Sequence, residues 1–226
     1  MLKRKMISIL LFIIGLSIFT YPIISNYYNK QKQMSIMNQY IESINHVDFE
    51  KEWEKVKKYN QNLLSQNIHD LLKDNISEYE DILNISGNGV IGIIEIPKIN
   101  VKLPIYHGTS DEVLKTGIGH IKGTSLPDTE INTHCVLSGH RGLPSSKLFS
   151  DLDQLEICDQ FSLQILNKEL TYQIDQISIV KPEEIDSLQI ETGKNYITLV
   201  TCTPYGINTH RLLVRGELLS EKDIEI

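Results

Sequence analysis

The pattern of apolar and polar residues divides the chain into three parts, and the first, residues 1–25, is typical of a membrane anchor. A mostly apolar run covers residues 6–24, and Lys3, Arg4 and Lys5 precede it. At about 1.5 Å per residue, this run is just long enough to cross the hydrocarbon core of a bilayer. No small-residue cleavage pattern follows it, which favours an uncleaved anchor over a removed signal peptide. The cationic flank predicts a cytoplasmic N-terminus and an external body.

The second part, residues 26–88, has the periodicity of helices. Apolar residues recur at intervals of three and four between about residues 34 and 83, which predicts one or two amphipathic helices with a break near 46–49. We expect these helices to pack on the main domain or to hold it away from the membrane. Gly87 and Gly89 lie in a turn-rich stretch that ends this part.

The third part, residues 89–226, has the residue pattern of β-strands. Short apolar runs rich in β-branched residues alternate with Gly, Pro, Asn and Asp, which predicts strands separated by turns. The predicted strands cover residues 90–97, 101–106, 134–137, 161–166, 170–179, 197–202 and 212–218. Many short strands with few long helices favour an antiparallel or mixed barrel, or a sandwich, over a doubly wound sheet.

Composition and charge narrow the classes of function. The 226 residues are 41% hydrophobic and 23% charged, which is typical of a folded globular protein. Acidic residues outnumber basic ones by 29 to 22, and basic residues do not cluster outside the N-terminus, so nucleic acid is not an expected partner. The three cysteines lack the spacing of a disulfide framework or a metal site, and their odd number leaves at least one thiol unpaired.

Cys202 differs from the other two cysteines in its setting. It ends an apolar run, and Pro204 then blocks continuation of the strand ladder, so the thiol is expected at a strand end where side chains are accessible. Alternation places Cys202 on one face of this strand and Thr201 on the other. Cys135 lies inside a predicted strand and is expected to be buried and inert, and Cys158 is expected to be an incidental thiol in a turn.

A catalytic cysteine needs a cationic neighbour or a base, because an unperturbed thiol with a pKa of about 8.5 is only slightly ionised near neutral pH. Residues 203–210 are few enough to fold the next strand back, which would bring Arg211 beside Cys202. A guanidinium there would favour anions and would stabilise the oxyanion of a tetrahedral intermediate. A lone arginine at a strand edge can equally be a solvated or salt-bridged residue.

A histidine is the expected base. His140 is favoured because it follows a predicted strand in a glycine-flanked loop that can present an imidazole, and His120 and His210 are the next candidates. The remaining histidines are His46 and His69, expected at the surface of the helical region, and His107 and His134. A zinc site built from Cys135, His140 and Cys202 is a further alternative, although close pairs of ligands are missing.

Several motifs taken together resemble the sortases, the cysteine transpeptidases of Gram-positive cell surfaces, and among them class C, the pilin-type sortases. The motifs are IEIPKI at 94–99, LPIYHGT at 103–109, GHIKGTSLP at 119–127, SGHRG at 138–142, TLVTC at 198–202 continuing as TPYG at 203–206, and His210 followed by Arg211. The likeness spans roughly residues 91–219. Several motifs in the same order make it specific, whereas any one of them alone would be weak.

The resemblance implies a mainly β, α+β fold: an eight-stranded sortase-type barrel in residues 89–226, preceded by N-terminal helices and the membrane anchor. It implies Cys202 as nucleophile, His140 as general acid and base, and Arg211 as stabiliser of substrate and oxyanion. Thr201 would help to hold the sorting signal or to support the oxyanion. No cofactor and no metal are implied.

In such enzymes the thiolate attacks an LPXTG-like sorting motif after its threonine and forms a thioacyl enzyme, which an amine resolves. The implied partners are surface proteins or pilin subunits that carry such a signal, and an amine acceptor, either a pilin lysine or a peptidoglycan precursor. The membrane is a third partner through the N-terminal helix. For class C the amine is usually a lysine of the next pilin subunit, so the product is an isopeptide-linked polymer.

The chain departs from class C in two respects. Members usually carry an Asp-Pro-aromatic lid over the cysteine, but residues 60–83 hold Asp70, Asp74 and Asp81 with no proline, so we expect the lid to be shortened, altered or absent. Many relatives also have a second, C-terminal membrane span, which is not found before residue 226, so one anchor is expected to suffice.

Other functions stay open at this point. A wall-anchoring sortase would use the same residues, and a thiol hydrolase would use them to release an acid instead of an amide. Outside the enzymes, a catalytically silent surface-binding barrel is the main alternative, with metal-bound structural cysteines as another.

Overall fold

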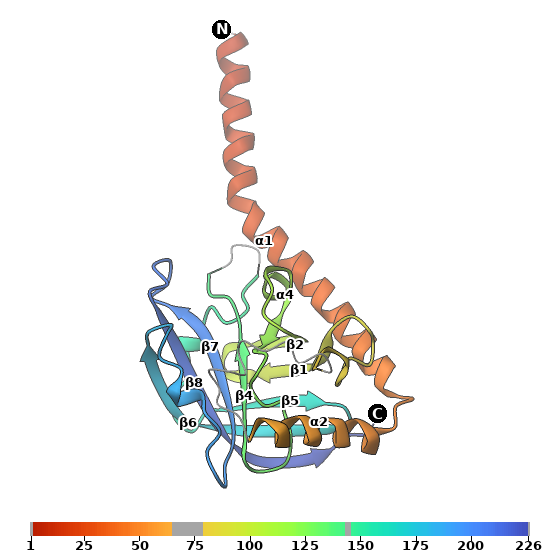
Figure 1. The fold of residues 1–226 in the computed structure, drawn as a ribbon. Coiled ribbons are helices and arrows are strands. Elements are labelled where there is room, and N and C mark those ends of the chain that lie inside the picture. The colour runs from red at the N-terminus through yellow and green to blue at the C-terminus, as the bar shows by residue number, and fades with distance from the viewer. Residues whose placement is uncertain (1, 65–78, 143–145, 226) are drawn as a thin grey trace.

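The computed structural model describes residues 2–64, 79–142 and 146–225, and its body is a closed barrel of eight strands (Figure 1). The strands are β1 Val90–Ile96, β2 Val101–His107, β3 Ile118–His120, β4 Thr133–Ser138, β5 Gln160–Ile165, β6 Lys168–Val180, β7 Asn195–Thr203 and β8 His210–Asp223. Around the barrel they follow the order β1-β2-β3-β4-β7-β8-β6-β5. The pairs β2–β3 and β4–β7 are parallel and the others are antiparallel. The predicted mixed barrel is therefore confirmed, and the sandwich is excluded.

Two long helices precede the barrel. Helix α1 is Leu2–Ile44 and α2 is Phe49–Leu63, so the helical pattern breaks close to the predicted position. Asp48 caps α2, because its side chain accepts a hydrogen bond from the backbone N–H of Lys51 at 3.3 Å. The other helices among the described residues are short: α4 Asp111–Thr116 and the 3₁₀ turns η1 Tyr79–Asp81, η2 Pro97–Ile99, η3 Leu152–Gln154 and η4 Asp186–Leu188.

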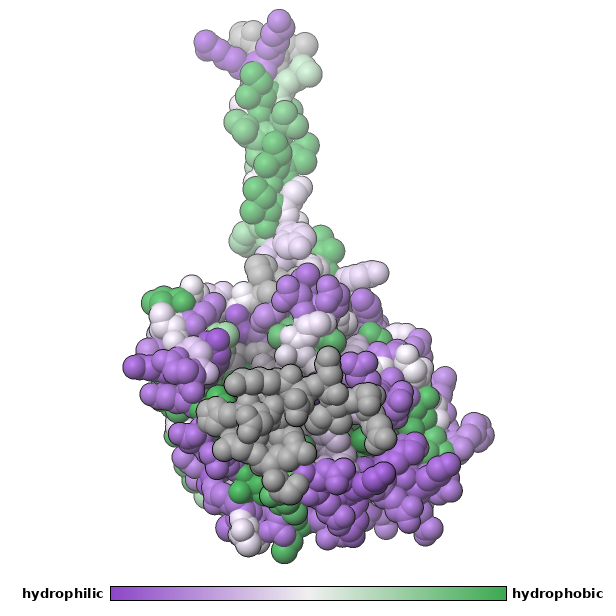
Figure 2. All heavy atoms as spheres, in the orientation of Figure 1, coloured by the Kyte–Doolittle hydropathy of each residue, from purple (hydrophilic) through white to green (hydrophobic). Residues whose placement is uncertain are grey.

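Helix α1 has two halves with different surroundings. Its N-terminal half is apolar and long enough to cross a membrane, and none of that stretch is buried against the rest of the protein. Figure 2 shows this half as a hydrophobic column that projects from a largely hydrophilic body. The second half packs on the barrel, where Met37, Tyr40 and Ile44 join the main core. The helix continues without a break across the predicted boundary at residues 25 and 26.

Polar contacts fix the second half of α1 to the barrel. The Tyr40 hydroxyl accepts a hydrogen bond from the Leu166 N–H at 2.9 Å and donates to the Ile91 carbonyl at 3.3 Å. Gln33 is buried, and its Nε2 donates to the Thr116 carbonyl at 2.8 Å and to the Ser146 hydroxyl at 3.3 Å. The apolar column and the barrel are thus joined by one continuous, anchored helix.

The strands near the C-terminus present different side chains to the two faces of the barrel wall. Ile197, Leu199 and Cys135 belong to the main core inside the barrel. A second, smaller apolar cluster consists of Val136, Leu188, Val200 and Leu213. Val200 alternates with Leu199 along β7, so the second cluster lies on the outer face of the wall. We call it the outer cluster.

Burial lowers the pKa of three histidines. His120 is fully buried, and its pKa falls to about 3 because the charged form loses its solvation. Its Nδ1 lies 2.7 Å from the Tyr79 hydroxyl and its Nε2 lies 2.9 Å from the Ser125 carbonyl. Desolvation also lowers the pKa of His107 and of His134. All three imidazoles are built into the protein interior in the neutral form.

Below pH 6.5 the free energy of unfolding is expected to fall as the pH falls. In the unfolded chain a histidine titrates near pH 6.5, whereas the folded-state pKa of His120 is about 3. The neutral imidazole therefore stabilises the fold fully above pH 6.5, and this contribution is lost at about 1.4 kcal/mol per pH unit as the pH approaches 3. His107 and His134 act in the same direction. Urea unfolding at a series of pH values between about 7 and 5 measures the effect; an unchanged midpoint would contradict it.

Candidate active site

Cys202 and Arg211 are directly opposite each other on neighbouring strands. Strands β7 and β8 are antiparallel, and Cys202 is the cross-strand partner of Arg211. A tight turn returns the chain, because the Pro204 carbonyl accepts hydrogen bonds from the N–H groups of Ile207 at 3.1 Å and Asn208 at 2.9 Å. Directly opposite residues in an antiparallel pair project to the same face. The short connection predicted from the sequence therefore brings Arg211 opposite Cys202 in the strand register.

His140 reaches the same edge of the barrel from β4. Strands β4 and β7 are parallel, with Ser138 opposite Val200, so both chains arrive at this edge in the same direction. The pairing extends one residue further, because the Gly139 N–H donates to the Val200 carbonyl at 3.0 Å. Two residues beyond Ser138 and Val200 lie His140 and Cys202. The expected nucleophile and base thus occupy equivalent positions at two adjacent strand ends.

The strand pattern puts Cys202 and Arg211 on the outer face. Val200 belongs to the outer cluster, and Cys202 follows it at the period of two that returns a strand to the same face. His140 follows the end of β4 by two residues. Cys202, His140 and Arg211 are all half-buried, so each side chain is accessible without being fully solvated. Val200, a member of the buried outer cluster, lies two residues before the thiol.

Backbone carbonyl groups, rather than a carboxylate, hold the Arg211 side chain. Its Nη1 donates to the carbonyls of His210 at 3.0 Å and Asn208 at 3.2 Å. Among the described residues, no carboxylate forms an ion pair with it. A guanidinium held only by neutral carbonyls keeps its positive charge available for an anion.

Thr201 faces away from the thiol. It is buried, and its hydroxyl donates to the Gly139 carbonyl at 2.8 Å. The contact ties β7 to the loop that carries His140. A direct part for Thr201 in holding substrate stays a prediction.

The structure distinguishes between the candidate histidines. His120 and His134 are buried, His107 is half-buried, and the imidazoles of all three are hydrogen-bonded within the protein. His210 is the cross-strand partner of Thr203, one residue beyond the Cys202 pair, so it projects to the opposite face. His46 is exposed in the turn between the two long helices. His69 lies outside the described residues, as does most of the segment expected to carry the lid, so the lid expectation stays untested.

The remaining cysteines do not join the site. All three cysteines are free thiols. Cys135 is buried in the main core, where burial raises the pKa of its thiol well above the usual value. Cys158 is exposed, with a left-handed φ of 74°. Cys135 is inside the barrel wall and Cys202 outside it, which separates the members of the proposed zinc site. Within residues 2–64, 79–142 and 146–225, no three His, Cys, Asp or Glu side chains are arranged to hold a metal ion.

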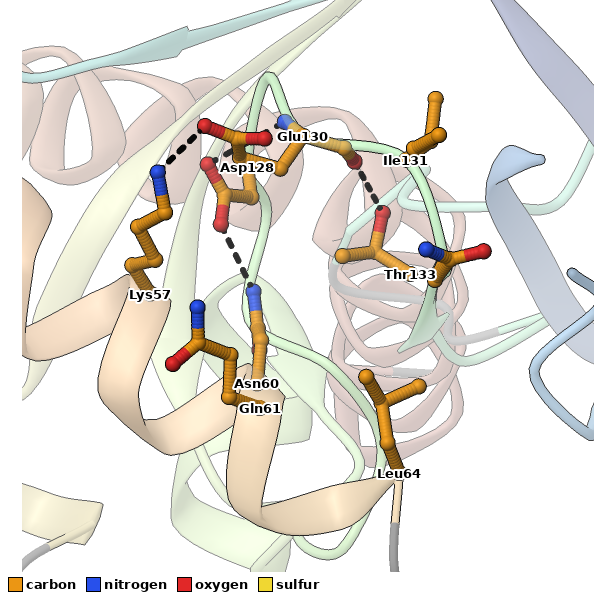
Figure 3. A pocket seen from close by; sticks show the side chains of 9 residues that line it. Lys57, Asn60, Gln61, Leu64, Asp128, Glu130, Ile131 and Thr133 are labelled. Carbon is orange, nitrogen blue, oxygen red and sulfur yellow. Dashed lines mark hydrogen bonds and ion pairs between the residues drawn. The ribbon is translucent and has the colours of Figure 1, made fainter. Parts of the chain in front are cut away.

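A cavity at the other end of β4 does not contribute to this site. It has a volume of about 150 Å³ and lies between α2 and the loop that leads into β4 (Figure 3). Its polar groups are bonded to one another: Asn60 Nδ2 donates to Asp128 at 3.1 Å, and Lys57 pairs with Glu130 at 2.6 Å. These contacts attach α2 to the barrel.

Acyl transfer through a thioester needs a nucleophile, an acid and base, and a group that stabilises the oxyanion. The thiol, the imidazole and the guanidinium at these strand ends are groups of those kinds. The family model described as the sortase domain matches residues 94–219. The chain belongs to the sortase family. Sortases are cysteine transpeptidases, and the match covers β2 to β7 completely and β8 as far as residue 219, with all three residues of the site.

Solved structures of class C sortases are similar to this sortase. Sortase C1 of Streptococcus agalactiae is 47% identical, with a TM-score of 0.73 over 84% of this chain and 98% of that one. Sortase C of Streptococcus pneumoniae is 38% identical, with a TM-score of 0.76 over 85% of this chain and 100% of that one. Among curated relatives, sortase D of Bacillus subtilis is 39% identical over 114 residues, which span 50% of this chain and 54% of that protein. The match therefore covers about half of that relative.

One neighbour of the site had no role assigned from the sequence. Arg141 lies in the SGHRG motif, and its side chain bonds to Thr203, the residue after the nucleophile, at 3.2 Å. Its position beside His140 was visible in the sequence, but its bonding partner was not. Nothing local to residue 141 indicates that a residue more than sixty positions away becomes its neighbour.

Proposed function

We propose that this chain is a membrane-anchored cysteine transpeptidase that cleaves an LPXTG-like sorting motif after its threonine and transfers the acyl group to an amine, in the first place a lysine of a pilin subunit. The observation that carries the proposal is the strand register. It pairs Cys202 with Arg211, and it pairs Ser138 with Val200, so that His140 follows the neighbouring strand end at the same distance as Cys202 follows Val200.

In the first half-reaction, the Cys202 thiolate attacks the carbonyl carbon of the threonine. Arg211 stabilises the negative charge that develops on the carbonyl oxygen. The C–N bond to the following residue breaks, and protonated His140 gives its proton to the departing amine. The result is a thioester between Cys202 and the sorting signal.

In the second half-reaction, an acceptor amine attacks the thioester carbon. Neutral His140 accepts the proton that this amine loses, and Cys202 leaves as the thiolate. The site returns to its starting state, with protonated His140 beside the thiolate, and the product carries a new amide bond. Two acyl transfers thus replace one difficult exchange.

Two neighbours of the thiol have proposed roles toward the sorting motif. We assign Thr201 a supporting part, in which its bond to Gly139 steadies the backbone behind the thiol. The cationic Arg211 is placed to meet the polar end of the motif.

The membrane assignment rests on α1. Its apolar half has the length of one span, and three basic residues precede it, which favours a cytoplasmic N-terminus with the barrel outside. A pilin acceptor is favoured over a wall precursor by two similar structures. One is sortase C of Streptococcus pneumoniae, whose structure bears on pilin substrate specificity, and the other is sortase C1 of GBS Pilus Island 1.

The ratio of ligated amide to hydrolysed acid among the products tests this function. Full-length protein in detergent is incubated with an LPXTG-type peptide, with and without a lysine-bearing donor, and the products are followed by mass spectrometry. The expected result is a ligated amide whose yield rises with donor concentration. Acid as the only product at every donor concentration would indicate a thiol hydrolase. Absence of any thioacyl adduct would favour the silent barrel.

A further inference from the structure

Two hydrogen-bonded links join the loop of His140 to the end of β7. The Thr201 hydroxyl donates to the Gly139 carbonyl at 2.8 Å, and Arg141 Nη1 donates to the Thr203 hydroxyl at 3.2 Å. Gly139 and Arg141 are the two neighbours of His140 in the chain, and Thr201 and Thr203 are the two neighbours of Cys202. The residues on both sides of the nucleophile are therefore hydrogen-bonded to the residues on both sides of the base.

The links lie on the face of β7 opposite the thiol. Thr201 and Thr203 alternate with Cys202 along the strand, and both are buried. A side chain on this face cannot occupy the space that substrate needs on the other face. The links can still control how closely the two strand ends approach.

The Arg141 side chain has a second partner besides Thr203. Its Nη2 forms an ion pair with Asp153 in η3, and its side chain is only 11% exposed. The planar guanidinium serves both partners at once, which a flexible ammonium group with a single nitrogen does less well. Arg141 Nε is buried and has no hydrogen-bond partner among the described residues. Because a buried unpaired N–H costs free energy, net stabilisation of the fold is a weak explanation for this residue.

We propose that Arg141 is a positioning residue that, through Thr203 and with Asp153 as its anchor, sets the distance and orientation between His140 and Cys202. Proton transfer requires the imidazole to lie within hydrogen-bond reach of the reacting group. A misplacement of about 1 Å can cost about a hundredfold in rate. The proposal deepens the function proposed above and rests on it for its kinetic test.

The kinetic test removes the link between Arg141 and Thr203 from either side. Arg141→Gln is expected to lower kcat by about tenfold to a hundredfold while KM stays within about twofold. Thr203→Val, which replaces the hydroxyl with a methyl group, is expected to lower kcat in the same way, whereas Thr203→Ser keeps the hydroxyl and retains most of the activity. The double variant Arg141→Gln, Thr203→Val is expected to be no slower than Arg141→Gln alone, because both changes break the same link.

Arg215 supplies a matched control. It is also a poorly exposed arginine, 17% exposed in its side chain, and it pairs with Asp175 at 2.7 Å and Glu191 at 3.1 Å. It faces Thr198 on β7, four residues before the nucleophile. Arg215→Gln therefore removes comparable ion pairs from the same barrel. A lower melting temperature with a wild-type kcat is expected.

A second readout needs no turnover. The rate at which iodoacetamide alkylates Cys202 is measured against pH by mass spectrometry of the peptide that contains Cys202. The pH profile of Arg141→Gln and of Thr203→Val is expected to resemble that of His140→Ala, because the imidazole no longer faces the thiol. Profiles that match the wild type would overturn the proposal, as would additive losses of kcat in the double variant. A wild-type enzyme that alkylates as expected but transfers no acyl group would instead overturn the proposed function.

Discussion

Cys202→Ala is expected to abolish the thioacyl adduct and to lower turnover by about a millionfold, to the background of the assay. The Cys202 sulfur is the only protein atom in the proposed reaction that forms a covalent bond to the acyl group, so no other side chain can replace it. Cys202 is half-buried at the end of β7, and its loss removes a single sulfur from the outer face. The melting temperature should therefore stay near that of the wild type.

The measurement is intact-protein mass spectrometry after incubation with an LPXTG-type peptide. Cys158→Ala is the matched control, because it removes an exposed thiol from a turn on another part of the barrel. The control should form the adduct at the wild-type rate. An adduct that persists in Cys202→Ala, or disappears in Cys158→Ala, would remove Cys202 from its proposed role.

His140→Ala is expected to lower kcat by about a hundredfold to ten thousandfold with the fold retained. The imidazole acts in both half-reactions, first as the acid that protonates the departing amine and then as the base toward the arriving one. Because His140 is half-buried and follows the end of β4, its removal should leave the barrel core intact. Steady-state transfer rates, together with a thermal melt of the same sample, measure both effects.

His210→Ala is the control that tests the argument from register. His210 lies only one residue from Arg211, but it pairs with Thr203 and so projects away from the thiol. Turnover within about threefold of the wild type is expected for a residue outside the reacting set. Equal losses in the two variants would show that proximity to the site, rather than the face of the strand, determines their effect.

Local patterns in the sequence determined much of the fold. Alternation of apolar residues predicted seven of the eight strands, and the two helices broke close to the expected position. β3, which is only Ile118–His120, was missed because three residues cannot display a period of two. The exposed strand end at Cys202 and the return of the chain to Arg211 also followed from the sequence, because Pro204 and a short connection act within a few residues of each other.

The separation of Cys135 from Cys202 and the link from Arg141 to Thr203 were decided only by the tertiary structure. Periodicity predicts which side chains share a face within one strand, but it does not predict which strand ends lie next to each other. That depends on the parallel pairing of β4 with β7, which the barrel imposes between segments more than fifty residues apart. The pairing brings His140 to Cys202, and barrel closure buries His120, because contacts between distant segments form only when the whole sheet closes.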